Sequence, residues 1–98
     1  MKLDPATRRD FHRIYAHHEH HSSADNAQAI EDALYEDVAT CDSLQTARYR
    51  ALTYKRVRNG YRLFFVEIAG INIIYAIYHQ REDWQTLISD RRVGLDEV

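Results

Sequence analysis

Apolar residues in the first half of the chain recur at the spacing of an α-helix. Asp4 followed by Pro5 is a favourable helix start, because aspartate caps free backbone N–H groups and proline fits the first helical turn. The apolar stripe then recurs at i, i+3, i+4 and i+7, at Phe11, Ile14, Tyr15 and His18. This spacing places the four side chains on one face and predicts an amphipathic helix.

A second helix is predicted after the polar segment HHEHHSS, and either Ser22 or Ser23 can cap it. Its apolar stripe, spaced by three or four residues, consists of Ala27, Ile30, Leu34, Val38 and Cys41. Two helices joined by a short polar turn form an αα-hairpin. The first half of the chain is therefore expected to be helical.

After Asp42 the apolar period changes to two, which is the period of β-strands. Asn59-Gly60 is typical of a two-residue type I′ hairpin turn, and Ala69-Gly70 marks a second turn. The product expected from these signals is a three-stranded antiparallel meander. Its strands are predicted at residues 48–58, 61–68 and 71–79.

The second and third predicted strands are apolar on both faces. Because successive side chains alternate, Leu63 and Phe65 are expected to lie opposite Phe64, Val66 and Ile68. The same alternation in the third strand is expected to place Ile71, Ile73 and Ile77 on one face and Ile74 and Ala76 on the other. A sheet that is apolar on both faces needs cover on both.

The helical hairpin can cover only one of these faces. A short C-terminal helix is predicted from the spacing of Trp84, Leu87, Ile88 and Arg91. This helix is too short to cover the second face completely. Either tyrosine side chains complete the cover, or a partner protein does.

The length of 98 residues indicates one domain over residues 1–98, and the predicted helices and strands make it α+β. A content of 45% hydrophobic and 29% charged residues is ordinary for a globular protein. Cys41 is the single cysteine, so no internal disulfide forms, which fits a reducing cytoplasm. The N-terminus lacks the apolar segment of a secretory signal, and the run INIIYAIY is too short to cross a membrane. We therefore expect a cytoplasmic protein without a membrane partner.

Charge is distributed unevenly along the chain. The formal net charge is −2, yet the segment from Thr46 to Arg62 has six basic residues and no acidic one. Basic side chains and interleaved tyrosines suit an RNA backbone, which they bind by charge, hydrogen bonds and stacking. The candidate RNA- or phosphate-binding residues are Arg48, Arg50, Lys55, Arg56, Arg58 and Tyr61. The alternative is a solvated edge strand whose cations prevent aggregation.

Candidate catalytic residues lie at neighbouring strand ends. His79 and Arg81 follow the third strand, and Arg62 lies on the adjacent one. In phosphodiester cleavage, the arginines would stabilise the developing negative charge and His79 would act as general acid or base. An RNA 2′-hydroxyl nucleophile requires neither metal nor cofactor. The alternative is a structural ion-pair network that joins Arg81 to Glu82, Asp83 or Glu67.

The segment HHEHH is a weaker candidate for chemistry. His17 and His21 are four residues apart and share a helical face, as metal ligands do. The sequence places no third ligand beside them, and the segment ends a helix next to a polar turn. A solvated helix end is the favoured interpretation, and no metal site is predicted.

Three strings, in this order along most of the chain, resemble the RelE/ParE superfamily of type II toxin–antitoxin toxins: LDPATRRDFHRIYAHH, RVRNGYRLFFVEI and IIYAIYHQRED. The family's N-terminal strand is here reduced to about Met1–Leu3. The resemblance implies an αα-hairpin packed on an antiparallel sheet. It also implies a cytoplasmic toxin that inhibits growth, contributes to plasmid stabilisation and is neutralised by a cognate antitoxin.

The superfamily divides by mechanism. RelE-like members are metal-independent endoribonucleases that cut mRNA on the ribosome, and Arg62 in GYRL matches their catalytic arginine. Arg81 falls at their second catalytic arginine, and His79 at the catalytic histidine of YoeB-like members. ParE-like members poison DNA gyrase without a nuclease site, and residues 76–83 resemble their C-terminal region. We expect mRNA cleavage, with gyrase poisoning and a non-catalytic interaction module as alternatives.

Overall fold

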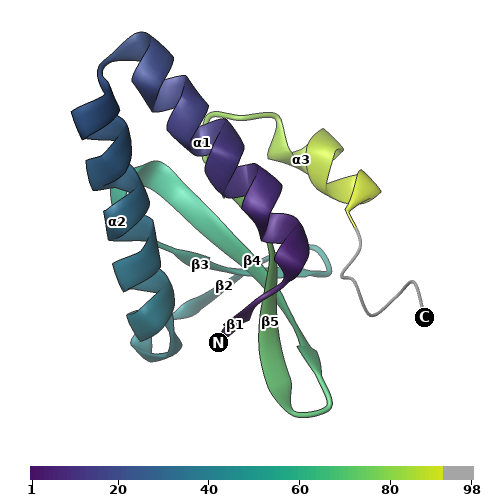
Figure 1. Ribbon diagram of the computed structural model, residues 1–98. Helices are drawn as coiled ribbons and strands as arrows, with labels where there is room; N and C mark the ends of the chain where they lie inside the picture. The colour runs from purple at the N-terminus through teal and green to yellow at the C-terminus, as the bar shows by residue number, and fades with distance from the viewer. Residues whose placement is uncertain (92–98) are drawn as a thin grey trace.

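The computed structural model describes residues 1–91 as an α+β fold (Figure 1). Two long helices pack on one face of a five-stranded mixed sheet, and a short C-terminal helix follows the last strand. The coarse prediction of an αα-hairpin on a sheet with a C-terminal helix is confirmed. No helix within residues 1–91 combines the length and apolarity needed to span a membrane.

The helical hairpin begins and turns at the predicted caps. The Asp4 carboxylate accepts the Ala6 N–H at 2.8 Å and caps a 3-10 turn that leads into α1 (Arg8–His21). Ser23 is the cap of α2 (Ala24–Thr40), because its hydroxyl accepts the Asn26 N–H at 3.0 Å. The apolar stripes of both helices face the sheet and enter one core with it.

The sheet has five strands in the order β1-β5-β4-β3-β2. Neighbours are antiparallel except for β1, which pairs parallel to β5. The short N-terminal strand, which the sequence left open, is therefore present. The strands are β1 (Lys2–Leu3), β2 (Thr46–Tyr49), β3 (Leu52–Arg56), β4 (Tyr61–Ile68) and β5 (Ile71–His79).

Two hairpin predictions need correction. The strand predicted over 48–58 is divided into β2 and β3, because Arg50 takes a φ of 55° and the chain reverses there. The turn at Asn59-Gly60 joins β3 to β4 as predicted, with φ values of 64° and 81°. Its loop has three residues, not two, since the Val57 N–H donates to the Tyr61 carbonyl oxygen.

A β-bulge changes the faces predicted for β5. Pairing shifts between Phe64 and Phe65, so that two consecutive β5 residues, Tyr75 and Ala76, lie on the same face. Ile74 and Ile77 consequently share the opposite face, although strict alternation separates them. The faces predicted for β4 are correct, with Leu63 and Phe65 toward the helices.

The second face of the sheet has a core of its own. It contains Phe64 and the aromatic rings of Tyr54, Tyr75 and Tyr78. Trp84, the first residue of α3 (Trp84–Leu87), is buried against this core, with its ring centroid 5.2 Å from that of Phe64. Tyrosines and the C-terminal helix thus supply much of the cover that this face of the sheet needs.

A buried ion pair attaches the end of the described chain to α1. Arg91 binds Asp10 through two hydrogen bonds of 2.8 Å, and its Nη2 also donates to the Tyr75 carbonyl oxygen at 2.6 Å. Burial by itself lowers the pKa of Arg91, but the hydrogen bonds and charge of Asp10 reverse the effect and raise the pKa. The guanidinium therefore stays charged inside the protein.

Candidate functional site

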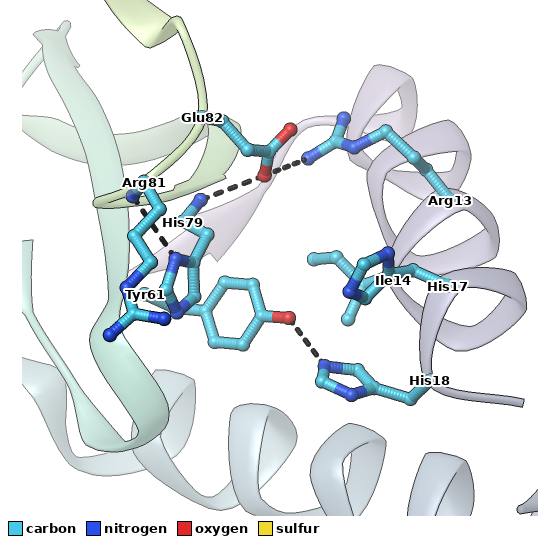
Figure 2. A pocket seen from close by; sticks show the side chains of 8 residues that line it. All are labelled: Arg13, Ile14, His17, His18, Tyr61, His79, Arg81 and Glu82. Carbon is cyan, nitrogen blue, oxygen red and sulfur yellow. Dashed lines mark hydrogen bonds and ion pairs between the residues drawn. The ribbon is translucent and has the colours of Figure 1, made fainter. Parts of the chain in front are cut away.

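A cleft of about 530 Å³ opens between α1 and the ends of β4 and β5 (Figure 2). Strands and helix contribute basic, imidazole and hydroxyl groups to the same space. The residues that line the cleft are Arg13, Ile14, His17, His18, Tyr61, His79, Arg81 and Glu82. Three predicted site residues, Tyr61, His79 and Arg81, are therefore brought together.

Strand register explains why Tyr61 and His79 share this cleft. Tyr61 is the first residue of β4, His79 is the last residue of β5, and the two are directly paired. Paired residues of an antiparallel sheet project to the same face. Their rings meet edge to face with centroids 5.1 Å apart. This face is the one that α1 covers, so His18 on the apolar stripe of α1 approaches the same tyrosine.

His18 and Tyr61 are joined by a hydrogen bond of 2.7 Å between Nε2 and the hydroxyl oxygen. Burial, followed by the nearby His17, His79 and His21, lowers the pKa of His18. Burial and the Glu82 carboxylate raise the pKa of Tyr61 to about 12, against a smaller opposing effect of Arg13. Near neutral pH, a protonated tyrosine thus faces an uncharged imidazole.

His79 is held in one orientation by the turn that follows β5. The Arg81 backbone N–H donates to His79 Nδ1 at 3.1 Å, so Nε2 carries the proton of the neutral ring. Gly60 leaves room for that nitrogen, because a Cβ at this position would lie 2.7 Å from His79 Nε2. Nε2 is therefore the ring atom left to exchange a proton with a substrate.

Glu82 and Arg13 form the rim of the cleft. Glu82 Oε1 accepts the His79 backbone N–H at 2.9 Å and Arg13 Nη2 at 3.3 Å. Arg13 Nη2 also donates to the Ile77 carbonyl oxygen at 2.7 Å. Glu82 and Arg13 thus form hydrogen bonds with the backbone groups at the outer edge of β5, beyond the part of this edge that pairs with β1.

Arg81 differs from Arg13 in its partners. Within residues 1–91, the Arg81 side chain forms no ion pair, whereas Glu82 is engaged by Arg13. The predicted alternative, a structural network in which Arg81 pairs with Glu82, Asp83 or Glu67, does not form there. An unpaired guanidinium at a cleft is available to an anionic ligand.

Arg62 lies on the other face of the sheet. It is paired with Tyr78, one residue before His79, and therefore projects away from the cleft. Its guanidinium carbon lies 4.9 Å from the ring centroid of Tyr54 and 5.1 Å from that of Trp84. The structure thus separates the three predicted catalytic residues into His79 and Arg81 on one face and Arg62 on the other.

Arg56 stands directly opposite Arg62 in the β3–β4 ladder, on the same face. Like charges at paired positions repel each other unless an anion lies between or near them. Neither arginine forms an ion pair with any residue in the described range 1–91. Together with Arg48 and Arg50, which are also exposed, Arg56 remains available to bind a phosphate backbone.

Two other predicted phosphate ligands have structural partners instead. Lys55 is buried, donates to the Leu44 carbonyl oxygen and lies over the Phe65 ring. Arg58 binds the carboxylates of Asp37 and Glu36 on α2 at 2.9 and 3.1 Å. These contacts fix β3 and its turn to the rest of the fold.

Sequence reasoning missed three residues of the cleft: Arg13, His17 and His18. The signal for His18 was its position on the apolar stripe of α1, which places it against the sheet rather than in solvent. The interpretation of HHEHH as a solvated helix end holds for four of its five residues, which are exposed, and is wrong for His18, which is partly buried against Tyr61. No group of three potential metal ligands occurs among residues 1–91.

Comparisons of the chain with protein-family models, with curated proteins and with solved structures found no significant match. The geometry of the cleft, together with the sequence pattern, therefore carries the functional argument.

Proposed function

We propose that this protein is a cytoplasmic toxin of the RelE/ParE type that inhibits growth by cleaving mRNA on the ribosome. The observation that carries the proposal is the convergence of His79, Arg81 and Tyr61 in one cleft, with Arg81 unpaired among the described residues. The order of elements, an αα-hairpin followed by an antiparallel sheet and a short helix, supports a RelE/ParE-like fold.

The cleft offers the groups that metal-independent RNA cleavage requires. A ribose 2′-hydroxyl attacks the adjacent phosphorus, and negative charge develops on the phosphate oxygens. Arg81 stabilises that charge, and His79 exchanges a proton through Nε2. Proton transfer by a positioned side chain typically contributes about 100- to 10,000-fold in rate.

The opposite face supplies RNA binding in this proposal. Arg56 and Arg62 present positive charge to a single strand, while the buried rings of Tyr54 and Trp84 support the Arg62 guanidinium from below. Arg50, in the turn after β2 (Thr46–Tyr49), lies over the Tyr49 ring and extends this basic surface, whereas Arg48 pairs with Thr53 and projects to the helix-side face of the sheet. Arg62 is thus assigned to binding, because the groups that contact it are rings and not proton donors or acceptors.

Gyrase poisoning is the second candidate, and the separation of Arg62 from His79 and Arg81 favours it. A chain in which the three matched residues do not meet resembles ParE-like members, which lack a nuclease site. In either case the toxin's partner is a cognate antitoxin. If the protein cleaves mRNA, its other partners are the ribosome and mRNA. If it poisons gyrase, its other partner is DNA gyrase.

A translation extract and a supercoiling assay distinguish these candidates. The purified protein is expected to cut mRNA in the extract, and Arg81→Ala is expected to abolish both cutting and growth arrest. Intact mRNA together with inhibited supercoiling by gyrase would assign the protein to the ParE-like branch. Inactivity in both assays and no growth arrest would leave the non-catalytic interaction module.

A further inference from the structure

We propose that the Tyr61 hydroxyl accepts the proton of the attacking 2′-hydroxyl and that His18 of α1 takes the Tyr61 proton in the same step. This inference rests on the proposed RNA cleavage and adds a helix residue to a site otherwise built from strand ends. Tyr61 is then a catalytic residue. His18, which acts through Tyr61, is a positioning and proton-accepting residue.

The geometry of the pair supports this assignment. Tyr61 is only 4% exposed, yet it lines the cleft, and Figure 2 shows its hydroxyl directed at the His18 ring. The Nε2 to hydroxyl distance of 2.7 Å is that of a good hydrogen bond. In the tautomer with an unprotonated Nε2, the Tyr61 hydroxyl donates to His18, and its oxygen lone pairs remain free to accept.

The protonation states of Tyr61 and His18 also favour transfer of a proton from Tyr61 to His18. A tyrosine with a pKa of about 12 holds its proton at neutral pH and cannot act as a base without a second acceptor. The lowered pKa of His18 keeps its imidazole uncharged and able to accept that proton. A nucleophile or base activated by an adjacent imidazole is a recurrent catalytic arrangement.

The reaction balances without an added reactant other than water. The 2′ oxygen bonds to phosphorus as its proton passes to the Tyr61 oxygen, and the Tyr61 proton passes to His18 Nε2. The bond from phosphorus to the 5′ oxygen breaks, and this oxygen takes the Nε2 proton of His79. Water in the cleft then carries the proton from His18 back to His79 Nε2, so both imidazoles return to their starting states. The products are a 2′,3′-cyclic phosphate and a 5′-hydroxyl.

Several charged or titratable groups surround the pair. His17 and His21 lie beside His18 on α1, and His79 faces it from β5. Glu82, Arg13 and Arg81 line the same cleft, and Glu82 and Arg13 act on Tyr61 with opposite sign. Since His17, His21 and His79 are also imidazoles, the test must separate His18 from its neighbours.

Two variants separate chemistry from packing. Tyr61→Phe keeps the ring and removes the hydroxyl. His18→Gln keeps a hydrogen-bonding side chain next to Tyr61 but cannot take up a proton near neutral pH. His20→Gln removes an exposed imidazole from the same helix segment and serves as the matched control.

The measurement is the single-turnover rate of mRNA cleavage in ribosome complexes between pH 5 and 9. Tyr61→Phe and His18→Gln are each expected to lower the rate about 100-fold or more, with substrate affinity within about twofold of the wild type. His18→Gln should also lose the acidic limb of the pH profile. His18→Ala should be partly rescued by added imidazole, which a structural role cannot explain.

The outcomes are distinct for the two proposals. If the wild-type protein cleaves RNA and His18→Gln cleaves it at the same rate and with the same pH profile, the inference is overturned and the proposed function stands. A wild-type protein that cuts no RNA would overturn the proposed function itself, and this inference with it.

Discussion

Replacing Asp10 with alanine removes the anion that joins α1 to Arg91 near the end of the described chain. Asp10 is fully buried and accepts hydrogen bonds of 2.8 Å from Arg13 and, at both oxygens, from Arg91. The Arg91 side chain is only 6% exposed, so its positive charge would be left inside the protein without this carboxylate. Arg13 and His18 are both on α1, so the ion pair also positions the cleft.

Removing one partner of a buried ion pair lowers the free energy of unfolding by about 3–5 kcal/mol, because the remaining charge stays desolvated. A domain of this size has a total stability of about 5–15 kcal/mol, so the loss is a large fraction. With a urea m-value of about 1.5 kcal/mol per M, the midpoint of unfolding should fall by about 2–3 M.

Urea unfolding followed by circular dichroism measures this change, and two variants calibrate it. Asp42→Ala removes an exposed carboxylate that pairs with the N-terminal amine, and its cost should be under about 1 kcal/mol. Asp10→Leu combined with Arg91→Met removes both buried charges and should be less destabilising than Asp10→Ala. A loss below about 1 kcal/mol for Asp10→Ala, or a larger loss for the double variant, would refute this reasoning.

Three further predictions concern the cleft and the second core. Because the pKa of His18 is lower in the folded than in the unfolded protein, the unfolded state binds more protons below about pH 6.5. The free energy of unfolding should therefore fall between pH 7 and 5, and His18→Gln should reduce that slope in urea titrations; an identical slope would contradict the assignment. Gly60→Ala should slow RNA cleavage, since its Cβ would displace His79, whereas Gly70→Ala, at nearly the same φ but with no neighbour within 4 Å, should leave cleavage unchanged. Trp84→Ala should cost about 3–5 kcal/mol in urea unfolding, and a loss under 1 kcal/mol would show that the second core does not depend on this ring.

Local signals along the chain predicted much of the fold. Asp4 and Ser23 are caps whose side chains bond backbone N–H groups two or three residues away, and such contacts are readable from sequence. Asn59, Gly60 and Gly70 adopt positive φ, as residue type suggests, although Ala69 at 53° does not follow from its residue type. These features depend on neighbours in the chain and not on distant packing.

The features that sequence could not supply depend on pairing between distant segments. The bulge at Tyr75 lies in a run that is apolar at almost every position, so alternation cannot reveal it. The turn at Arg50 places a non-glycine residue at positive φ, which residue type does not indicate. Arg58 is neutralised by Asp37 and Glu36, which come from a helix more than twenty residues earlier.

The division of the predicted catalytic residues has the same origin. Arg62 and His79 were both placed at strand ends, but only the register decides which residues share a face. Tyr61 pairs with His79, so Arg62, one position later, projects to the opposite side. His18 was visible as part of an apolar stripe, yet its contact with Tyr61 required the packing of α1 on the sheet.

The central claim is that the cleft between α1 and the ends of β4 and β5 is where RNA is cut. The most direct test compares the single-turnover rate of mRNA cleavage on the ribosome for His79→Ala and for Arg62→Ala, both at saturating enzyme. We predict a fall of about 100-fold or more for His79→Ala. We predict a fall of less than about tenfold for Arg62→Ala, because its contribution is to binding. A near wild-type rate for His79→Ala, with cleavage abolished in Arg62→Ala, would place the reaction on the opposite face and contradict this account.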